Sequence, residues 1–363
     1  MENKPKKSLL FRALANLAAF AAGCALVVLV LGAAEGTLRI KAHFKKQPKD
    51  SLEFGNLHQH VNQKTLGFKP LPSIVMKDSV LRGERRVYEA EYTIDGNSRR
   101  MTPCDSPETR DSVAAFFGCS FTFGRGVQDD ETFPARFAAH CPAYLPLNYG
   151  YNGYGPQQAW LLLNRLGALN ELPSKKGAVV FTFIDNHLDR LVGATSILSV
   201  WGYPMPWLTI ENGAIHWAGT FNDRMTIQSL WARYAEQTHL VKFVENHMPR
   251  RSHPPENTAG AVTLFATVME ECGRAVAKAG PELKFYCLIF PGTPPPCSTA
   301  VADALRGRKG VVLLDYSRLL DGAPYTDDKL WYDDSPWAPW GHPRALAYDL
   351  VAARLARDIG GCD

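Results

Sequence analysis

The sequence predicts an α/β protein with a doubly wound parallel sheet of five strands, preceded by one N-terminal transmembrane helix. Five short apolar runs lie between residues 112 and 316, and helical patterns alternate with them. Runs that are apolar throughout are typical of a parallel sheet covered on both faces. A third observation, an uncharged apolar stretch near the N-terminus, predicts the membrane helix.

The N-terminal apolar stretch covers residues 13–34 and contains no charged side chain. It is long enough to cross a hydrocarbon core of roughly 30 Å, so we interpret it as a membrane anchor after a cytoplasmic tail of residues 1–12. A cleaved signal peptide, ending near Gly32, Ala33 and Ala34, is the alternative, although its apolar region is usually only ~7–15 residues. Basic residues flank the stretch on both sides and do not orient it.

Composition excludes some classes of function. The net charge is +4, and much of the basic excess lies near the N-terminus, which argues against a nucleic-acid-binding protein. The eight cysteines contain no C-x-x-C pair, so we expect no structural metal and no cofactor. Seven of these cysteines lie beyond the apolar stretch, which fits an oxidising compartment without revealing a pairing.

A membrane-proximal extension with some β structure is expected over residues 35–110, before the sheet domain at 111–363. Pro48, Pro70 and Pro72 interrupt any long helix in the extension. The segment RRVYEAEYTID alternates in the manner of a strand, and GNSRR after it predicts a turn.

The predicted sheet domain has its strands and helices in alternation. Helical patterns follow Thr132, cover residues 157–166 and 260–279, and follow Pro343. In such a sheet the functional site lies beyond the carboxyl ends of the strands. The five predicted strands are SVAAFFG (112–118), YLPLNYG (144–150), GAVVFTFI (177–184), LKFYCLIF (283–290) and GVVLLDY (310–316).

Polar residues with chemical potential follow these strands. Because the strand ends share one edge, we expect the polar groups to converge there, although a serine in a strand-to-helix loop is by itself a common turn residue. The residues are Ser120 after the first strand, Asn148 and Gly153 after the second, Asp185, Asn186, His187 and Arg190 after the third, and His342 before the last helix.

These motifs resemble those of the SGNH (GDSL-like) hydrolase superfamily, over roughly residues 112–360, and the YTID segment followed by arginine resembles its membrane-anchored bacterial members. The resemblance implies an SGNH/flavodoxin-like three-layer sandwich. GCSFTFGRGVQDDETFP is similar to the first block, with Ser120 as nucleophile, and NYGYNGYG to the second, with the Gly153 N–H in the oxyanion hole. FIDNHLDR and GHP occupy the third and last blocks, which implies His342 as general base.

Three positions depart from the family pattern. Cys119 stands where an aspartate is usual, and it is either a small buried residue or, as a distinct reading, the nucleophile itself. His187 follows Asn186 in place of an aspartate, so both side chains are candidates for the third oxyanion donor. Pro339 occupies the usual position of the triad acid, which leaves Asp333, Asp334 or a serine and histidine dyad.

The resemblance implies acyl transfer through an acyl-serine, on O-acetyl groups of an extracellular or cell-envelope polysaccharide, with the domain in the periplasm at the bacterial inner membrane. Water as acceptor gives an esterase and a sugar hydroxyl an acetyltransferase, and the sequence does not separate the two. Partners in polysaccharide export or acetylation are expected. Candidate substrate-binding residues are Arg190, Trp337 and Trp340. The alternative is a catalytically inactive relative that binds polysaccharide or an assembly partner.

Overall fold

The computed structural model describes residues 9–44, 52–54, 60–224, 238–247, 258–334 and 341–362. They fall into two compact units, residues 1–47 with 230–253 and residues 48–229 with 254–363. The first unit contains α1 (Leu9–Phe44) and α8 (His239–His247). The Glu35 carboxylate of α1 accepts from the backbone N–H groups of His239 and Leu240, at 2.9 and 2.7 Å, and so caps α8.

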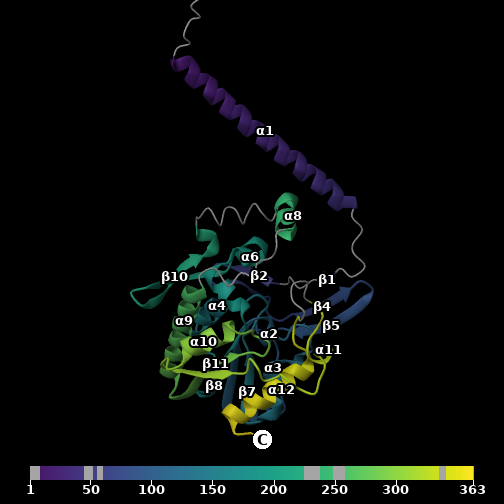
Figure 1. The fold of residues 1–363 in the computed structure, drawn as a ribbon. Coiled ribbons are helices and arrows are strands. Elements are labelled where there is room, and N and C mark those ends of the chain that lie inside the picture. Colours follow the sequence, from purple (N-terminus) through teal and green to yellow (C-terminus); the bar gives the residue numbers. More distant parts are fainter. Residues whose placement is uncertain are drawn as a thin grey trace, which may run out of the picture. The chain divides into compact units, whose positions relative to one another are not determined.

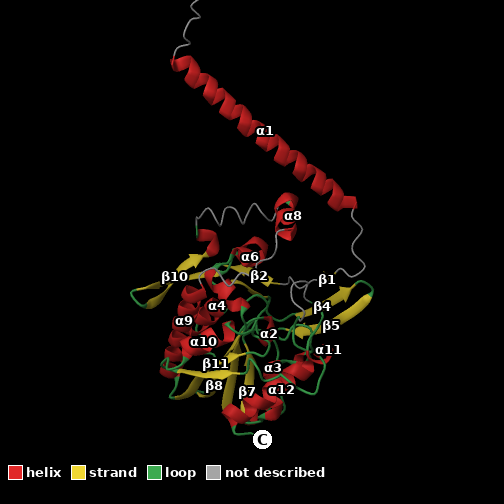
Figure 2. Ribbon diagram, viewed as in Figure 1, coloured by secondary structure: helices red, strands yellow, loops and turns green. Residues whose placement is uncertain are grey.

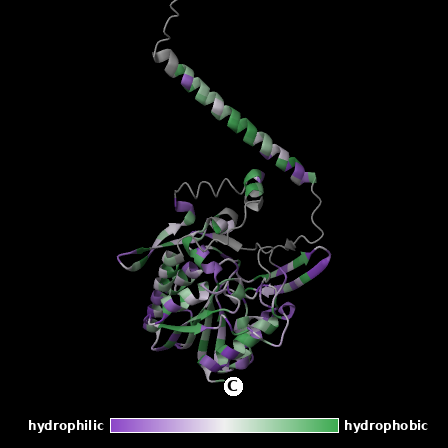
Figure 3. Ribbon diagram, viewed as in Figure 1, coloured by the Kyte–Doolittle hydropathy of each residue, from purple (hydrophilic) through white to green (hydrophobic). Residues whose placement is uncertain are grey.

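Helix α1 is long and apolar enough to span a membrane between Leu14 and Lys41, by length and composition. Its middle turns are continuously hydrophobic, as Figure 3 shows. The N-terminal apolar stretch is therefore confirmed as a helix.

The second unit is built on a parallel sheet of five strands in the order β12-β11-β8-β6-β7. Figures 1 and 2 label β7, β8 and β11 of this sheet. The predicted α/β class and all five predicted strands are confirmed. The strands are β6 (Ser112–Phe117), β7 (Tyr144–Asn148), β8 (Lys176–Phe183), β11 (Glu282–Ile289) and β12 (Val311–Asp315), and every neighbouring pair is parallel.

Both faces of this sheet are covered, because alternate side chains of each buried strand point to opposite sides. Phe116 and Val180 pack with α3 and α12, whereas Phe181 and Phe183 pack against Phe265 of α9 with their rings tilted. The doubly wound prediction is thus confirmed. The helices are α2 (Ser120–Phe123), α3 (Phe133–His140), α4 (Pro156–Asn164), α5 (Asn186–Val192), α6 (Thr195–Ile197), α9 (Thr258–Ala279), α10 (Cys297–Leu305), α11 (Asp327–Leu330) and α12 (Ala345–Leu355).

The remaining strands are antiparallel and lie in the same unit. A three-stranded sheet in the order β1-β4-β5 includes most of the predicted RRVYEAEYTID strand as β5. The hairpin β9-β10 was not predicted. The boundary predicted between residues 110 and 111 stays a prediction. The strands are β1 (Leu52–Phe54), β2 (His60–Gln63), β3 (Gly67–Pro70), β4 (Val75–Arg82), β5 (Arg85–Thr93), β9 (Pro206–Glu211) and β10 (Ala214–Thr220).

One disulfide joins the end of α3 to the C-terminal residues, between Cys141 and Cys362. Cys119, Cys272 and Cys287 are free and buried. Covalent linkage of residues 221 positions apart in the sequence restricts the unfolded chain and so stabilises the sheet domain.

Candidate active site

Ser120 lies in a tight turn between β6 and the short helix α2. Gly118 has φ +152°, and a Cβ there would collide with the Thr122 hydroxyl and lie 3.2 Å from the Thr182 carbonyl oxygen. Only glycine fits, so the chain turns sharply and Ser120 becomes the first residue of α2. The N–H of a first helical residue has no partner in its own helix, which leaves it as a donor at the site.

Three side chains from distant segments form a hydrogen-bonded relay. His342 Nε2 lies 2.9 Å from Ser120 Oγ, and His342 Nδ1 lies 2.7 Å from Asp334 Oδ2. The backbone N–H of His342 also donates to Asp334 Oδ1, at 2.9 Å. Because a carboxylate accepts and does not donate, this network assigns the ring proton to Nδ1 and leaves Nε2 to accept from the serine hydroxyl.

A small antiparallel bridge brings Asp334 to His342. The Tyr332 N–H donates to the His342 carbonyl and the Gly341 N–H to the Tyr332 carbonyl, both at 2.8 Å. Gly341 is required here, since a Cβ at this position would overlap the Asp334 carboxylate. The bridge places the acid eight residues before the histidine instead of three.

The Asp334 side chain is completely buried, yet its pKa is lowered. Burial alone would raise this pKa, but the charge and hydrogen bonds of His342, together with the charge of Arg125, outweigh it. Asp333, the other candidate, points elsewhere: its carboxylate pairs with Arg82 at 2.7 Å and Arg85 at 2.8 Å. Of the two predicted acids, Asp334 is the one that bonds to His342.

The loop after β7 is tied to the turn at Ser120. The Asn148 side chain donates to the Thr122 carbonyl at 3.0 Å, and the Tyr151 N–H donates to the Gly118 carbonyl at 3.2 Å. Gly153 has φ +81° in the turn that the Tyr154 N–H closes on the Tyr151 carbonyl, at 3.0 Å. In the described part of the chain the Gly153 N–H has no hydrogen-bond partner, so it is available as a donor.

The two candidates for the third oxyanion donor lie in different environments. Asn186 begins α5 directly after β8 and is partly exposed. His187 is completely buried against Phe181 and Phe183, with ring centroids 5.3 and 5.9 Å away, and its Nδ1 accepts the Ile184 N–H at 3.3 Å. Burial lowers the pKa of His187 well below its ordinary value. Of the two, Asn186 therefore stays the candidate donor.

The predicted substrate-binding residues are placed as follows. Arg190 is only 8% exposed, and its Nε and Nη1 donate to Asn186 Oδ1 at 2.8 Å and to the Tyr154 carbonyl at 2.7 Å. The Arg190 guanidinium thus bonds to other residues of the protein and is not exposed for binding a substrate. Trp337 and Trp340 lie outside the described residues. Cys119 is fully buried in the core cluster of α3 and α12, which removes its thiol from a nucleophile's position.

Arg100, which was not among the predicted site residues, supports the serine turn. Its fully buried guanidinium donates to the carbonyl oxygens of Phe123 and Val127, at 2.8 and 2.7 Å, and to Asp129 at 2.9 Å. These bonds fix the segment that follows α2. In the sequence, the only indication of this role was that an arginine follows the YTID segment. The pattern of a strand and a turn does not show which backbone carbonyls that arginine reaches.

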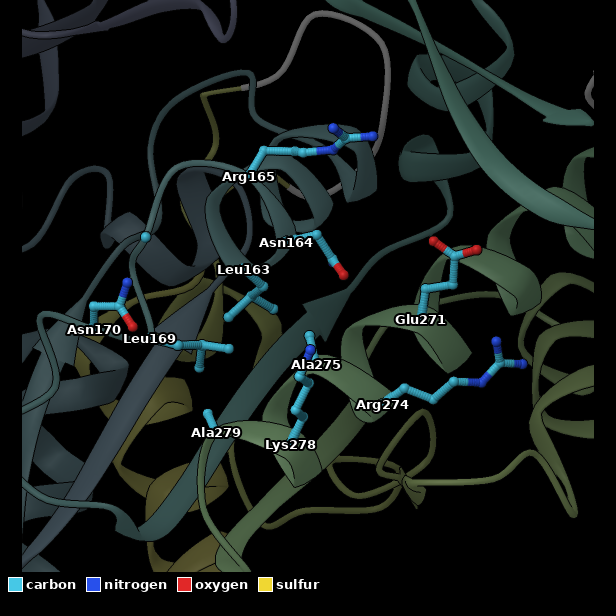
Figure 4. A pocket seen from close by; sticks show the side chains of 11 residues that line it. Leu163, Asn164, Arg165, Leu169, Asn170, Glu271, Arg274, Ala275, Lys278 and Ala279 are labelled. Carbon is cyan, nitrogen blue, oxygen red and sulfur yellow. The ribbon is translucent and has the colours of Figure 1, made fainter.

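A separate depression of about 620 Å³ lies between α4 and α9. Figure 4 shows Arg165, Arg274 and Lys278 around it, and none of the relay residues lines it. No group of three metal-ligating side chains occurs among the described residues. The relay at Ser120, and not this depression, is therefore the candidate active site.

No family model and no curated protein matches the sequence. An active-site mutant of a family two carbohydrate esterase from Clostridium thermocellum is similar at 11% identity and TM-score 0.38, over 72% of this chain and 65% of that one. A lipolytic G-D-S-L family member from Veillonella parvula is similar at 12% and 0.37, over 68% and 97%. The salicylyl-acyltransferase SsfX3 of a tetracycline biosynthetic pathway is similar at 12% and 0.36, over 69% and 55%.

The parallel five-stranded sheet has a serine at the end of β6 and a histidine before α12, in the places that the resemblance of the sequence to the SGNH (GDSL-like) superfamily implies. The chain spans about two thirds of the length of the carbohydrate esterase. These distant likenesses carry no argument about activity, which rests on the geometry at Ser120.

Proposed function

We propose that this chain is a serine-dependent acyl ester hydrolase or acyltransferase that works through an acyl-serine. The observation that carries the proposal is the relay from Ser120 Oγ to His342 at 2.9 Å and from His342 to Asp334 at 2.7 Å. A serine hydroxyl at its free pKa is a poor nucleophile and needs an adjacent, oriented base. Asp334 supplies the orientation, because its buried carboxylate holds the ring proton on Nδ1.

In the acylation step, Ser120 Oγ attacks the ester carbonyl carbon while its proton moves to His342 Nε2. The carbonyl oxygen becomes an oxyanion, for which the N–H groups of Ser120 and Gly153 and the Asn186 amide are the proposed donors. One such donor is typically worth about 10²- to 10³-fold in kcat. Collapse of the tetrahedral species breaks the ester C–O bond, and His342 returns the proton to the leaving alcohol. An acceptor hydroxyl, of water or of a sugar, then repeats these steps on the acyl-serine.

The substrate that we propose is an O-acetylated polysaccharide outside the cytoplasm. Helix α1 supports a single-pass anchor in the bacterial inner membrane, and the Cys141–Cys362 disulfide supports a periplasmic catalytic unit, since disulfides persist in oxidising compartments. Trp337 and Trp340 stay proposed as sugar-binding residues. An acetyltransferase would need a partner in the export or acetylation machinery, because one span does not carry an acyl donor across the membrane.

The direct test is intact mass of the full chain in detergent after reaction with a fluorophosphonate. We expect one stoichiometric adduct, none with Ser120→Ala, and slow formation with His342→Ala. His140→Ala is the matched control, since His140 also bonds to an aspartate, Asp349 at 2.9 Å, but to no serine in the described structure. Acetate release from acetylated polysaccharide then tests the substrate. A folded protein that forms no adduct would favour a catalytically inactive polysaccharide-binding protein.

A further inference from the structure

The Arg190 side chain connects the two segments that carry the candidate oxyanion donors. Its Nε bonds to Asn186 on α5, and its Nη1 bonds to the Tyr154 carbonyl, one residue after Gly153. We propose that Arg190 is a positioning residue of the oxyanion hole that fixes both donors at once. The inference rests on the proposed function and deepens it.

Arg190 decides which end of the Asn186 amide is free. A guanidinium has only donors, so Asn186 must turn its oxygen towards Nε, and the 2.8 Å bond occupies that oxygen. The NH₂ group, which carries two donors, is left for an oxyanion. If the Asn186 amide were flipped, its NH₂ group would face the N–H groups of the Arg190 guanidinium, and neither side could accept a hydrogen bond. The charge of Arg190 therefore excludes the orientation in which Asn186 would repel the developing negative charge.

The same guanidinium holds the exit of the Gly153 turn. The Tyr154 carbonyl accepts a hydrogen bond from Arg190 Nη1 at 2.7 Å, and the Tyr154 N–H donates to the Tyr151 carbonyl. The Tyr154 hydroxyl donates to the Phe68 carbonyl at 2.9 Å. Gly153 is confined within this turn, because a Cβ at its position would lie 3.0 Å from the Trp201 ring. Trp201 also faces the Arg190 guanidinium, at 5.5 Å from its ring centroid.

The bonding pattern separates this role from substrate binding and from a surface ion pair. Within the described residues Arg190 makes no salt bridge, and its own carbonyl accepts from the Gln157 side chain on α4, at 2.9 Å. The residue thus links α5, α4 and the loop between β7 and α4 at a single buried point. A group that acts through Asn186 changes the stabilisation of the transition state more than the binding of the ground state.

The test is a double-mutant cycle on the full chain in detergent, with p-nitrophenyl acetate as the probe and kcat and KM determined separately. Arg190→Met is expected to lower kcat about 10- to 100-fold with KM within about threefold, and Asn186→Ala about 100-fold or more. In the double variant we expect a further loss beyond Asn186→Ala that is smaller than the loss caused by Arg190→Met alone, because the share that acts through the Asn186 amide is already gone and only the hold on the Gly153 turn remains to be lost. Arg190→Lys, which keeps a donor for one partner, should recover part of kcat.

Arg224→Met is the matched control: Arg224 donates to the Val192 carbonyl at the end of the same helix and faces Trp207, just as Arg190 donates to a carbonyl and faces Trp201. It should retain kcat within about twofold. Fully multiplicative losses in the cycle, or a rise in KM with unchanged kcat for both Arg190 variants, would overturn the positioning role while the proposed function stands. If Ser120→Ala turns over the probe as fast as the unchanged chain, both proposals fail.

Discussion

Two histidines were candidates for the site, His187 after β8 and His342 before α12, and their surroundings differ in the contacts that decide their chemistry. His342 has both ring nitrogens engaged, one by Asp334 and one by Ser120, and its side chain is 17% exposed. His187 has no exposure, lies between two phenylalanine rings, and uses one nitrogen to accept a backbone N–H.

The difference teaches that position at the edge of a sheet does not make a histidine a catalyst. A general base needs a reacting hydroxyl on one nitrogen and an acceptor for the proton on the other. The bridge at Tyr332 brings Asp334 to one nitrogen of His342, and the turn after β6 places Ser120 at the other. The helical start at α5 turns His187 into the core, where burial keeps it neutral.

Exchange of each histidine for glutamine tests this comparison most strongly. We expect His342→Gln to lower kcat on p-nitrophenyl acetate by about 10³- to 10⁴-fold, because general base catalysis at Ser120 is lost. His187→Gln retains an acceptor for the Ile184 N–H and should stay within about threefold. Equal losses in the two folded variants would break the distinction between them.

The neighbouring acids sharpen the same comparison at a smaller effect. Asp334→Asn should lower kcat about 10²- to 10³-fold, since the amide no longer holds the Nδ1 proton. Asp333→Asn removes only pairs with Arg82 and Arg85, of which Arg85 is largely exposed, so kcat should change less than about threefold. A larger kcat loss for Asp333→Asn than for Asp334→Asn would show that Asp334 is not the acid that orients His342.

The part of this site that the sequence predicts is the part encoded locally. Ser120 follows an apolar run and a glycine, and His342 precedes a proline and a helical pattern, so each is visible within a few residues. The five parallel strands are visible for the same reason, since each is a buried run of its own.

The rest depends on contacts between distant segments. The sequence leaves Asp333 and Asp334 equal, because only the pairing of Tyr332 with Gly341 and His342 turns one carboxylate inward and leaves the other to the β4-β5 hairpin. The hairpin β9-β10 was missed because its first strand begins at Pro206, a residue type that usually interrupts strands. Arg190 was predicted to bind substrate, whereas its partners are Asn186 and a carbonyl that lies 36 residues earlier in the chain.

The pH dependence of stability gives the smallest expected effect and isolates His187. In the folded chain burial lowers its pKa well below 6.5, so between about pH 6.5 and 5 the unfolded chain binds a proton that the folded chain does not. Stability should therefore fall with decreasing pH by up to about 1.4 kcal/mol per unit from this residue. His187→Gln should flatten that slope in thermal unfolding of the full chain in detergent.

The control is His216→Gln, which removes a histidine whose side chain is 53% exposed and should leave the slope nearly unchanged. Asp334 does not interfere, because a lowered carboxyl pKa contributes stability that is lost only as pH falls through that lower value, outside this window. An unchanged slope in His187→Gln would mean that His187 reaches solvent when protonated. His187 would then not be a buried, neutral histidine, and its contrast with His342 would no longer hold.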